Sequence, residues 1–432
     1  MSNIYKKFTE AIKNLSLSFT RESLLAGFFF FLVLCSWYVL RPVRNEMAVQ
    51  NSDILPYLLG VGALVMLVLN PVYSWLASRN NLRGVLIGCY SFFILNLFGF
   101  IVLWEFFELS SSTFSFKTIL IELEFTLSQI FYVWCNVYSF FVVSIFWVVI
   151  INLFRGDLAA NVFGVIAAGG SIGAFIGSEI SKQLASTFNE SGVLFFTLIA
   201  IVFLFAALVA GLFLLQRFSY LKGMNESPGG SSFDAIKNLV SSSQIRSIGL
   251  YMYLWTALMT IHWVTSVEII NLWSSDGGNR IIFFSNIEQT VTVLTLFTQL
   301  FLTSLIIRVA GPQKILMIYG ILFIAAFIGY FLNPSIGYVF VVSVVLRLFE
   351  YGVNKPTREL IFSYLKKVDR YKSSVFVDTF LVRLGDFSGS GFILASKSFG
   401  VIFSQIPLIS IPFAGCLVYL GYKIPSKDKN NY

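Results

Sequence analysis

Long apolar runs separated by short polar connections dominate this chain of 432 residues. A helix needs about 20 apolar residues to cross a bilayer, so runs of about 18 or more residues predict spans. The predicted spans are 22–40, 54–77, 83–104, 125–153, 161–181, 192–215, 247–270, 287–307, 313–332, 335–354, 374–396 and 401–422. The runs are continuous and do not alternate apolar with polar residues, which favours helices over a membrane barrel. The pattern therefore predicts an all-α membrane protein with twelve transmembrane helices.

Composition and charge agree with a membrane protein. Only 12% of the residues are charged and the mean hydropathy is +0.80, whereas a soluble domain carries roughly 25% charged residues. If the N-terminus is cytoplasmic, most Lys and Arg residues fall in connections on the cytoplasmic side. This distribution predicts that both termini are cytoplasmic. It also explains the net charge of +8 without a nucleic-acid partner. The sequence implies no particular oligomer.

A central polar stretch divides the predicted spans into two groups of six. Residues 216–246 contain Ser227-Pro-Gly-Gly-Ser-Ser232 and are predicted to form a cytoplasmic linker. Two six-helix halves with a central linker are typical of the major facilitator superfamily. The predicted organisation is a lead at 1–21, an N-terminal bundle at 22–215, the linker at 216–246, a C-terminal bundle at 247–422 and a tail at 423–432.

Several classes of protein are disfavoured by what the sequence contains. A Gly-x-x-x-x-Gly-Lys-Ser/Thr phosphate loop is absent from the sequence, which argues against a nucleotide-driven pump. His262 is the single histidine, so a histidine metal cluster cannot be assembled, and the sequence shows no motif that pairs it with a nucleophile. We therefore predict neither an enzyme, nor a cofactor, nor a metal site.

Two similar basic signatures follow apolar runs and are the strongest functional candidates. We name Arg41–Glu46 the first basic cluster and Lys355–Glu359 the second basic cluster. In each, two cations three residues apart share a helix face, and the proline between them frees a carbonyl one turn earlier. Paired cations beside a broken helix suit an anion, although arginines at a helix end also snorkel to headgroups. The candidate anion-binding residues are Arg41, Arg44, Lys355 and Arg358.

Other polar residues lie within the predicted spans, where charge is costly and ionisable groups are candidates for function. A stripe at spacings of three, four and four residues joins Arg347, Glu350, Asn354 and Arg358 on one helix face. Arg358 has little local neutralisation beyond Glu359, which points elsewhere on the helix. The further binding candidates are Arg347, Glu350, Asn136 and His262, and the candidates for gating or coupling are Glu46, Asp378, Arg383 and Asp386.

Each of these candidates also has a structural interpretation. Arg347 with Glu350, and Arg383 with Asp386, are spaced to form ion pairs that lock helices together. His262 is also explained as a buried, hydrogen-bonded histidine. Three glycines, Gly169, Gly173 and Gly177, follow one another at four-residue spacing, which predicts a seam where another helix packs closely.

Several segments resemble a known family. Tyr38–Met47, Phe140–Trp147, Phe163–Gly173, Lys355–Phe362, Asp369–Lys372, Phe376–Thr379 and Arg383–Asp386 are similar to the bacterial, major-facilitator-type relatives of the ATP/ADP (nucleotide) translocases. The resemblance implies a multi-pass protein of the bacterial inner membrane that exchanges nucleotides, using basic residues that match Arg44 and Arg358.

These observations predict a secondary transporter that works by alternating access. Its expected partners are the lipid bilayer and an anionic or zwitterionic small molecule, with nucleotides as the leading candidates. Two alternatives remain open at this stage: a proton-coupled transporter of another metabolite, such as a siderophore or an amino-acid-like compound, and a membrane receptor or assembly partner that does not transport.

Overall fold

The computed structural model describes residues 20–79, 81–106, 113–117, 122–154, 157–188, 193–218, 243–363 and 377–424. Most of the predicted lead, linker and tail lies outside these residues, as do the Asp369–Lys372 motif and the side chain of Asp378. The chain divides into two compact units. Unit 1 takes Met1–Glu46, Tyr73–Ser227 and Gly277–Gln289, and unit 2 takes Met47–Val72, Pro228–Asp276 and Thr290–Tyr432. These units are defined by contacts between residues and not by consecutive stretches of sequence, so they do not test the predicted division into six-helix halves, which stays a prediction.

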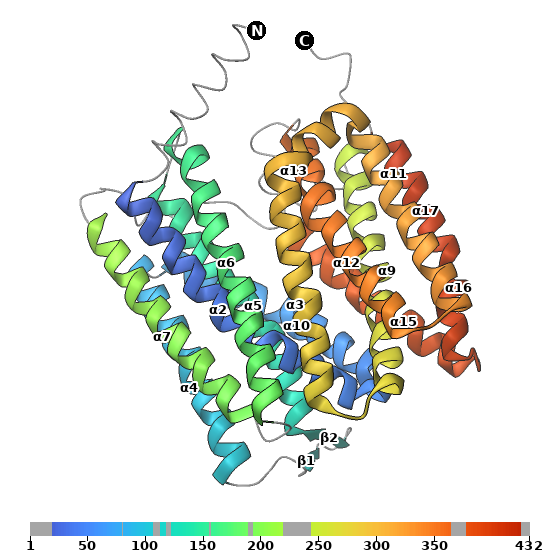
Figure 1. Ribbon diagram of the computed structural model, residues 1–432, viewed down its shortest axis with the longest axis horizontal. Coiled ribbons are helices and arrows are strands. Elements are labelled where there is room, and N and C mark those ends of the chain that lie inside the picture. Colours follow the sequence, from blue (N-terminus) through green and yellow to red (C-terminus); the bar gives the residue numbers. More distant parts are fainter. Residues whose placement is uncertain are drawn as a thin grey trace, which may run out of the picture. The chain divides into compact units, whose positions relative to one another are not determined.

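Unit 1 is built from long helices that run side by side (Figure 1). Its helices are α2 (Arg21–Gln50, as far as Glu46), the end of α3 (Leu55–Arg79), α4 (Leu82–Ile101) with the π-helical turn η2 (Val102–Phe106), α5 (Leu127–Leu153), α6 (Asp157–Phe188), α7 (Val193–Arg217) and the start of α10 (Gly277–Phe297). Thr126 caps α5 in a capping box with Gln129, which satisfies free N–H groups at the first turn.

The predicted glycine seam forms and joins α6 to α2. A side chain at Gly169 or Gly173 would collide with the backbone oxygen of Gly27 or Phe31, and one at Gly177 would lie 2.8 Å from Cys35 O. Backbones approach this closely only where side chains are missing. The packing interpretation of this glycine motif is therefore confirmed, and the seam fixes the course of α2, which carries the first basic cluster.

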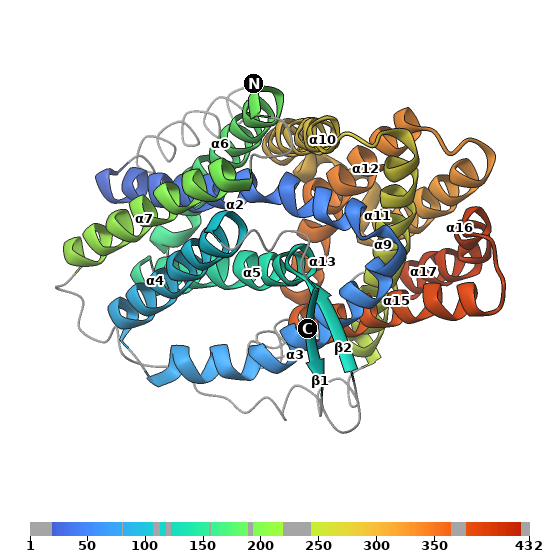
Figure 2. The ribbon, with the colours of Figure 1, turned by 90° about the horizontal axis from the view of Figure 1, so that it is seen from below.

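Unit 2 contains the remaining helices, and Figure 2 shows several of them end to end or side by side. They are η1 (Ser52–Ile54), the start of α3, α9 (Ser243–Trp273), the end of α10, η5 (Thr298–Leu302), α11 (Thr303–Leu332), α12 (Ile336–Phe349), η6 (Glu350–Asn354), α13 (Lys355–Ser363), η7 (Val377–Leu381), α15 (Val382–Ser398), η8 (Phe403–Gln405), α16 (Ile406–Ile409) and α17 (Ile411–Lys423).

A second glycine seam holds unit 2 together. A side chain at Gly385 would collide with Thr256 and Tyr253 O, and one at Gly389 would lie 2.7 Å from Ala257 O, so α15 packs closely on α9. In both units, therefore, glycines four residues apart let one helix lie directly on the backbone of another.

The helices correspond to the predicted spans. Among the described residues, nine helical stretches are long and apolar enough to cross a membrane. One of them, Gly277–Leu332, bends at Gly311, which stands directly before Pro312. The positive φ of 77° at Gly311 suits glycine. This stretch therefore supplies two spans. α9 and the segment η7–α15 coincide with the spans predicted at 247–270 and 374–396. The predicted count of twelve therefore fits.

Two sequence-based expectations about helix ends need correction. The first span does not end at residue 40, because α2 continues through Pro42 to Gln50. The tenth does not break at Pro356 either, because η6 carries the helix on into α13. An antiparallel hairpin, which was not predicted, precedes α5: β1 (Thr113–Lys117) pairs with β2 (Glu122–Thr126).

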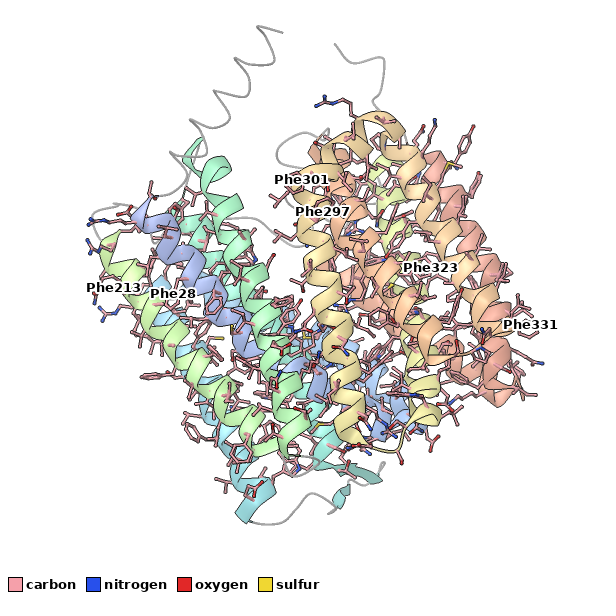
Figure 3. All side chains as sticks on the ribbon, in the orientation of Figure 1. Phe28, Phe213, Phe297, Phe301, Phe323 and Phe331 are labelled. Atoms are coloured by element: carbon pink, nitrogen blue, oxygen red, sulfur yellow. The ribbon has the colours of Figure 1, made fainter. Side chains whose placement is uncertain are left out.

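Large apolar side chains cover the outer faces of the helices. Figure 3 labels Phe28, Phe213 and Phe331, which are all substantially exposed, together with Phe323, which is fully buried. Exposed aromatic and aliphatic side chains on this scale are expected of a protein whose solvent is lipid. The fold is thus an all-α membrane architecture.

Candidate functional site

Arg41 and Glu46, the first and last residues of the first basic cluster, form ion pairs with residues of α10. Arg41 Nη1 lies 3.1 Å from Glu288 Oε2, and Glu46 Oε1 lies 3.2 Å from Arg280 Nη1. Arg41 also donates to the Tyr38 hydroxyl at 3.0 Å. Of these two pairs, only the side chain of Arg41 keeps appreciable exposure, at 18%. Glu46 is therefore in an ion pair, and its partner lies 234 residues away along the chain.

Arg44 lies in a different environment from Arg41. Its Nη1 donates to Asn136 Oδ1 at 2.7 Å, and its Nε and Nη2 donate to Asn45 Oδ1 at 3.1 and 2.6 Å. Asn136 Nδ2 donates to Tyr132 O at 3.1 Å, which turns the amide oxygen towards the arginine. Amide oxygens orient a guanidinium without cancelling its charge.

Aromatic rings flank the same guanidinium. Arg44 Cζ lies 5.4 Å from the centre of the Tyr132 ring and 6.0 Å from that of Trp37. Both distances fall within the range in which a cation is attracted to a ring face. The side chain of Arg44 is half-buried, so α2 and α5 hold a positive charge in a fixed orientation among amides and rings.

In the second basic cluster, the arginine is paired with a carboxylate of its own helical segment. Arg358 Nη1 lies 2.8 Å from Glu350 Oε1, and Asn354 Nδ2 donates to Glu350 Oε2 at 2.7 Å. All three side chains are buried, and Arg358 stacks 5.0 Å from the centre of the Trp255 ring. Lys355, also a binding candidate, is exposed. The predicted stripe thus brings Glu350, Asn354 and Arg358 together. The expectation that Arg358 has little local neutralisation is wrong, because Glu350 pairs with it.

Aromatic hydroxyl groups support this pair from neighbouring helices. The Tyr251 hydroxyl donates to Asn354 Oδ1 at 3.3 Å, and Trp255 Nε1 donates to the Tyr319 hydroxyl at 2.9 Å. Tyr319 in turn donates to Leu346 O at 3.2 Å. α9 and α11 therefore fix the positions of both the ring under Arg358 and the amide beside Glu350.

The gating candidates on α15 form the predicted i, i+3 pair. Arg383 Nη1 lies 3.0 Å from Asp386 Oδ2, and the hydroxyl of Thr260 donates to Asp386 Oδ1 at 3.2 Å. The side chains are 30% and 23% exposed. The pair connects α15 to α9 beside the glycine seam at Gly385.

The remaining two candidates lie on α9 and α12. His262 Nδ1 lies 3.0 Å from the Tyr330 hydroxyl, which is itself 3.1 Å from the hydroxyl of Ser266. His262 is buried, in agreement with the structural interpretation of this residue. Arg347 is half-buried on α12, one turn before Glu350.

Several residues of these clusters were not among the sequence-based candidates. Glu288 lies inside a predicted span, so the rule that ionisable residues in spans are candidates would have selected it. Arg280 stands just outside a predicted span, and its pairing gives no local signal. Tyr251 and Tyr319 are aromatic residues in apolar helices, where packing is the more common explanation.

This fold is also found in solved structures of membrane transporters. No protein-family model matches the chain, and no curated protein matches it in sequence. The similarities lie instead with solved structures.

Three of these structures illustrate the similarity. A mutant form of the nucleoside transporter NupG superposes with a TM-score of 0.65 at 12% identity, over 94% of this chain and 100% of its own. A bacterial homologue of the human lysosomal transporter Spinster, inward-facing and unoccupied, gives 0.60 at 13% identity, over 95% and 96%. The human organic anion transporter MFSD10 gives 0.58 at 12% identity, over 93% and 99%.

Proposed function

We propose that this chain is a secondary active transporter of the bacterial inner membrane that carries an anionic organic solute by alternating access. Nucleotides are the first candidates. The fold supports a transporter, and the solved structures that share it include proteins described as nucleoside and organic anion transporters. Both termini are proposed to be cytoplasmic, because the basic connections fall on that side.

The observation that carries the proposal is the setting of Arg44. A guanidinium held by two amide oxygens and flanked by two aromatic rings presents an oriented charge to an anion, and a planar base can stack on the rings. In unit 2, Arg358 is likewise placed on the ring of Trp255. We assign anion binding to Arg44 and Arg358, support to Arg41 and Lys355, and gating to Asp378, Arg383 and Asp386.

Counterflow in proteoliposomes tests the proposal. Vesicles loaded with ADP should take up labelled ATP, and the same assay with a nucleoside, an amino acid and a siderophore should define the solute class. Uptake that requires a phosphate or carboxylate group on the solute supports the proposal. Transport restricted to neutral or cationic solutes would show that the proposed charge selection is wrong.

A proton-coupled transporter is the second candidate, because buried carboxylates are paired with arginines. Glu46, Glu288 and Glu350 each lie within 3.2 Å of an arginine nitrogen and are almost completely buried. Protonation of such a carboxylate would release its arginine, which links proton binding to a change in helix contacts. A pH gradient that drives uptake into vesicles without internal solute would favour this candidate over exchange.

A further inference from the structure

A proline in the second basic cluster leaves one backbone carbonyl without its usual donor. Pro356 has no N–H, so it cannot donate to the carbonyl of Gly352 four residues earlier. Inside a membrane no water is at hand to replace the missing bond, and an unsatisfied carbonyl is costly. The protein must therefore supply another donor at this point of the helix.

Thr303, from a neighbouring segment of unit 2, supplies that donor. Its hydroxyl donates to Gly352 O with an oxygen–oxygen distance of 2.5 Å, across 49 residues of sequence. The same hydroxyl lies 3.0 Å from Thr298 O, in the π-helical turn η5. Gln299 Nε2 adds a bond of 3.0 Å to the preceding carbonyl, that of Tyr351. Gln299 of η5 and Thr303 at the start of α11 therefore lie against η6 and satisfy two successive carbonyls of it.

Glycine makes this approach possible. A Cβ at Gly352 would lie 3.0 Å from Thr298 Cγ2, which is closer than ordinary van der Waals contact. A side chain at this position would require Thr298, and with it η5, to give way. The contact thus depends on Pro356, Gly352 and Thr303 together.

The consequence is a change of helical register. The N–H of Lys355 donates to Glu350 O, five residues earlier, which defines one wider π turn. An α-helix turns about 100° per residue, so residues eight apart differ by about 80° around its axis. The wider turn removes most of this offset, and Arg358 then meets Glu350 at 2.8 Å across eight residues.

We propose that Thr303 is a positioning residue for anion binding by Arg358. By occupying the carbonyl of Gly352, its hydroxyl holds the π turn, and the π turn holds Arg358 against Glu350 and over the ring of Trp255. The step from position to transport rests on the proposed function, whereas the step from Thr303 to the setting of Trp255 does not.

The test compares four variants of the full-length protein. Thr303→Val keeps the size of the side chain and removes the hydroxyl, Thr303→Ala removes it without placing a methyl group beside the carbonyl, and Thr303→Ser retains it. Thr265→Val is the matched control, because the Thr265 hydroxyl also donates to a helical carbonyl, that of Ile261 at 2.8 Å, but in a regular stretch of α9.

The first readout is independent of transport. The protein is labelled with 5-fluorotryptophan, and the ¹⁹F resonance of Trp255 is assigned with Trp255→Phe. Thr303→Val and Thr303→Ala should both shift this resonance, whereas Thr303→Ser and Thr265→Val should leave it in place. An unchanged Trp255 resonance in folded Thr303→Val or Thr303→Ala overturns the proposal, and so does a Thr303→Ser protein that behaves like Thr303→Val.

The second readout separates positioning from simple loss of stability. In proteoliposomes the KM for the transported anion should rise about tenfold in Thr303→Val, as expected for one lost hydrogen bond in a binding arrangement, and Thr303→Ser should restore it. A lower Vmax with an unchanged KM would contradict the positioning role. Absence of anion transport by the wild type would contradict the proposed function instead, and the ¹⁹F result would still decide the role of Thr303.

Discussion

The two basic clusters have almost the same sequence and reach different structures. In the first, α2 passes through Pro42 as a helix, and its end charges pair with Glu288 and Arg280 on another helix, α10. In the second, the helix widens into a π turn before Pro356, and Arg358 pairs with Glu350 on its own helix. The comparison teaches that a proline between two cations does not determine the local structure, because the neighbouring helices decide how the freed carbonyl and the charges are satisfied.

The largest effect is expected where the second cluster loses a charge. Glu350→Leu removes the carboxylate that Arg358 contacts, and breaking a buried pair from one side costs about 3–5 kcal/mol. Thermal unfolding in detergent should therefore show a strongly lowered midpoint. Combining Arg358→Leu with Glu350→Leu should recover much of the lost midpoint, because the double variant no longer buries an arginine without this carboxylate. A double variant as unstable as the sum of the singles would show that the two residues act independently.

The first cluster should respond to charge reversal across two segments. Glu46→Arg alone places two cations together and should lower the free energy of unfolding by about 2 kcal/mol or more. The yield of folded protein should fall sharply as a result. Arg280→Glu in the same protein re-forms the pair in the opposite sense, so stability should return in part. The same measurement on Arg280→Glu alone completes the cycle, and an absence of coupling would remove Arg280 as the partner of Glu46.

The glycine seam tests whether close packing against α6 determines the course of α2. Gly173→Ala puts a methyl group against the backbone of Phe31, and overpacking of this kind costs about 1–3 kcal/mol. Gly164→Ala is the matched control on the same helix, because nothing lies within 4 Å of its Cβ position. Unfolding midpoints should fall for the first variant and stay level or rise for the second. Equal midpoints would indicate that the seam does not constrain α2.

The smallest effects are expected from the prolines, and they separate the two clusters most directly. Pro356→Ala returns an N–H to the carbonyl of Gly352, which should relax the π turn and shift the ¹⁹F resonance of Trp255. Pro42→Ala should leave that resonance unchanged and alter stability by about 1 kcal/mol or less, because α2 is already continuous. A π turn that persists in Pro356→Ala would mean that Thr303 and Gly352 suffice to form it.

Local features of the fold were predictable from sequence. The spans follow from the length of apolar runs, the close-packing face of α6 follows from glycines at four-residue spacing, and the Arg383–Asp386 pair follows from a spacing of three. Each depends on one stretch of chain and its helical period. The same local rule placed Glu350, Asn354 and Arg358 on one face.

The pairings within the candidate site were less accessible. The Glu46–Arg280 pair joins residues 234 apart, and nothing in either segment specifies the other. The contact between Arg358 and Glu350 depends on a π turn, which depends in turn on a hydroxyl from Thr303. Such features arise from packing between helices, and a pattern read along one helix does not contain them.

Uptake by an Arg44 variant tests the central claim most directly. Proteoliposomes containing wild type, Arg44→Gln or Arg83→Gln are compared for a transported nucleotide and for the matching nucleoside, Arg83 being an exposed arginine at the start of α4. We predict that Arg44→Gln lowers nucleotide uptake at least about tenfold, as expected when a charge-assisted contact is lost, and that Arg83→Gln does not. Nucleotide uptake unaffected by Arg44→Gln would contradict anion binding by this residue.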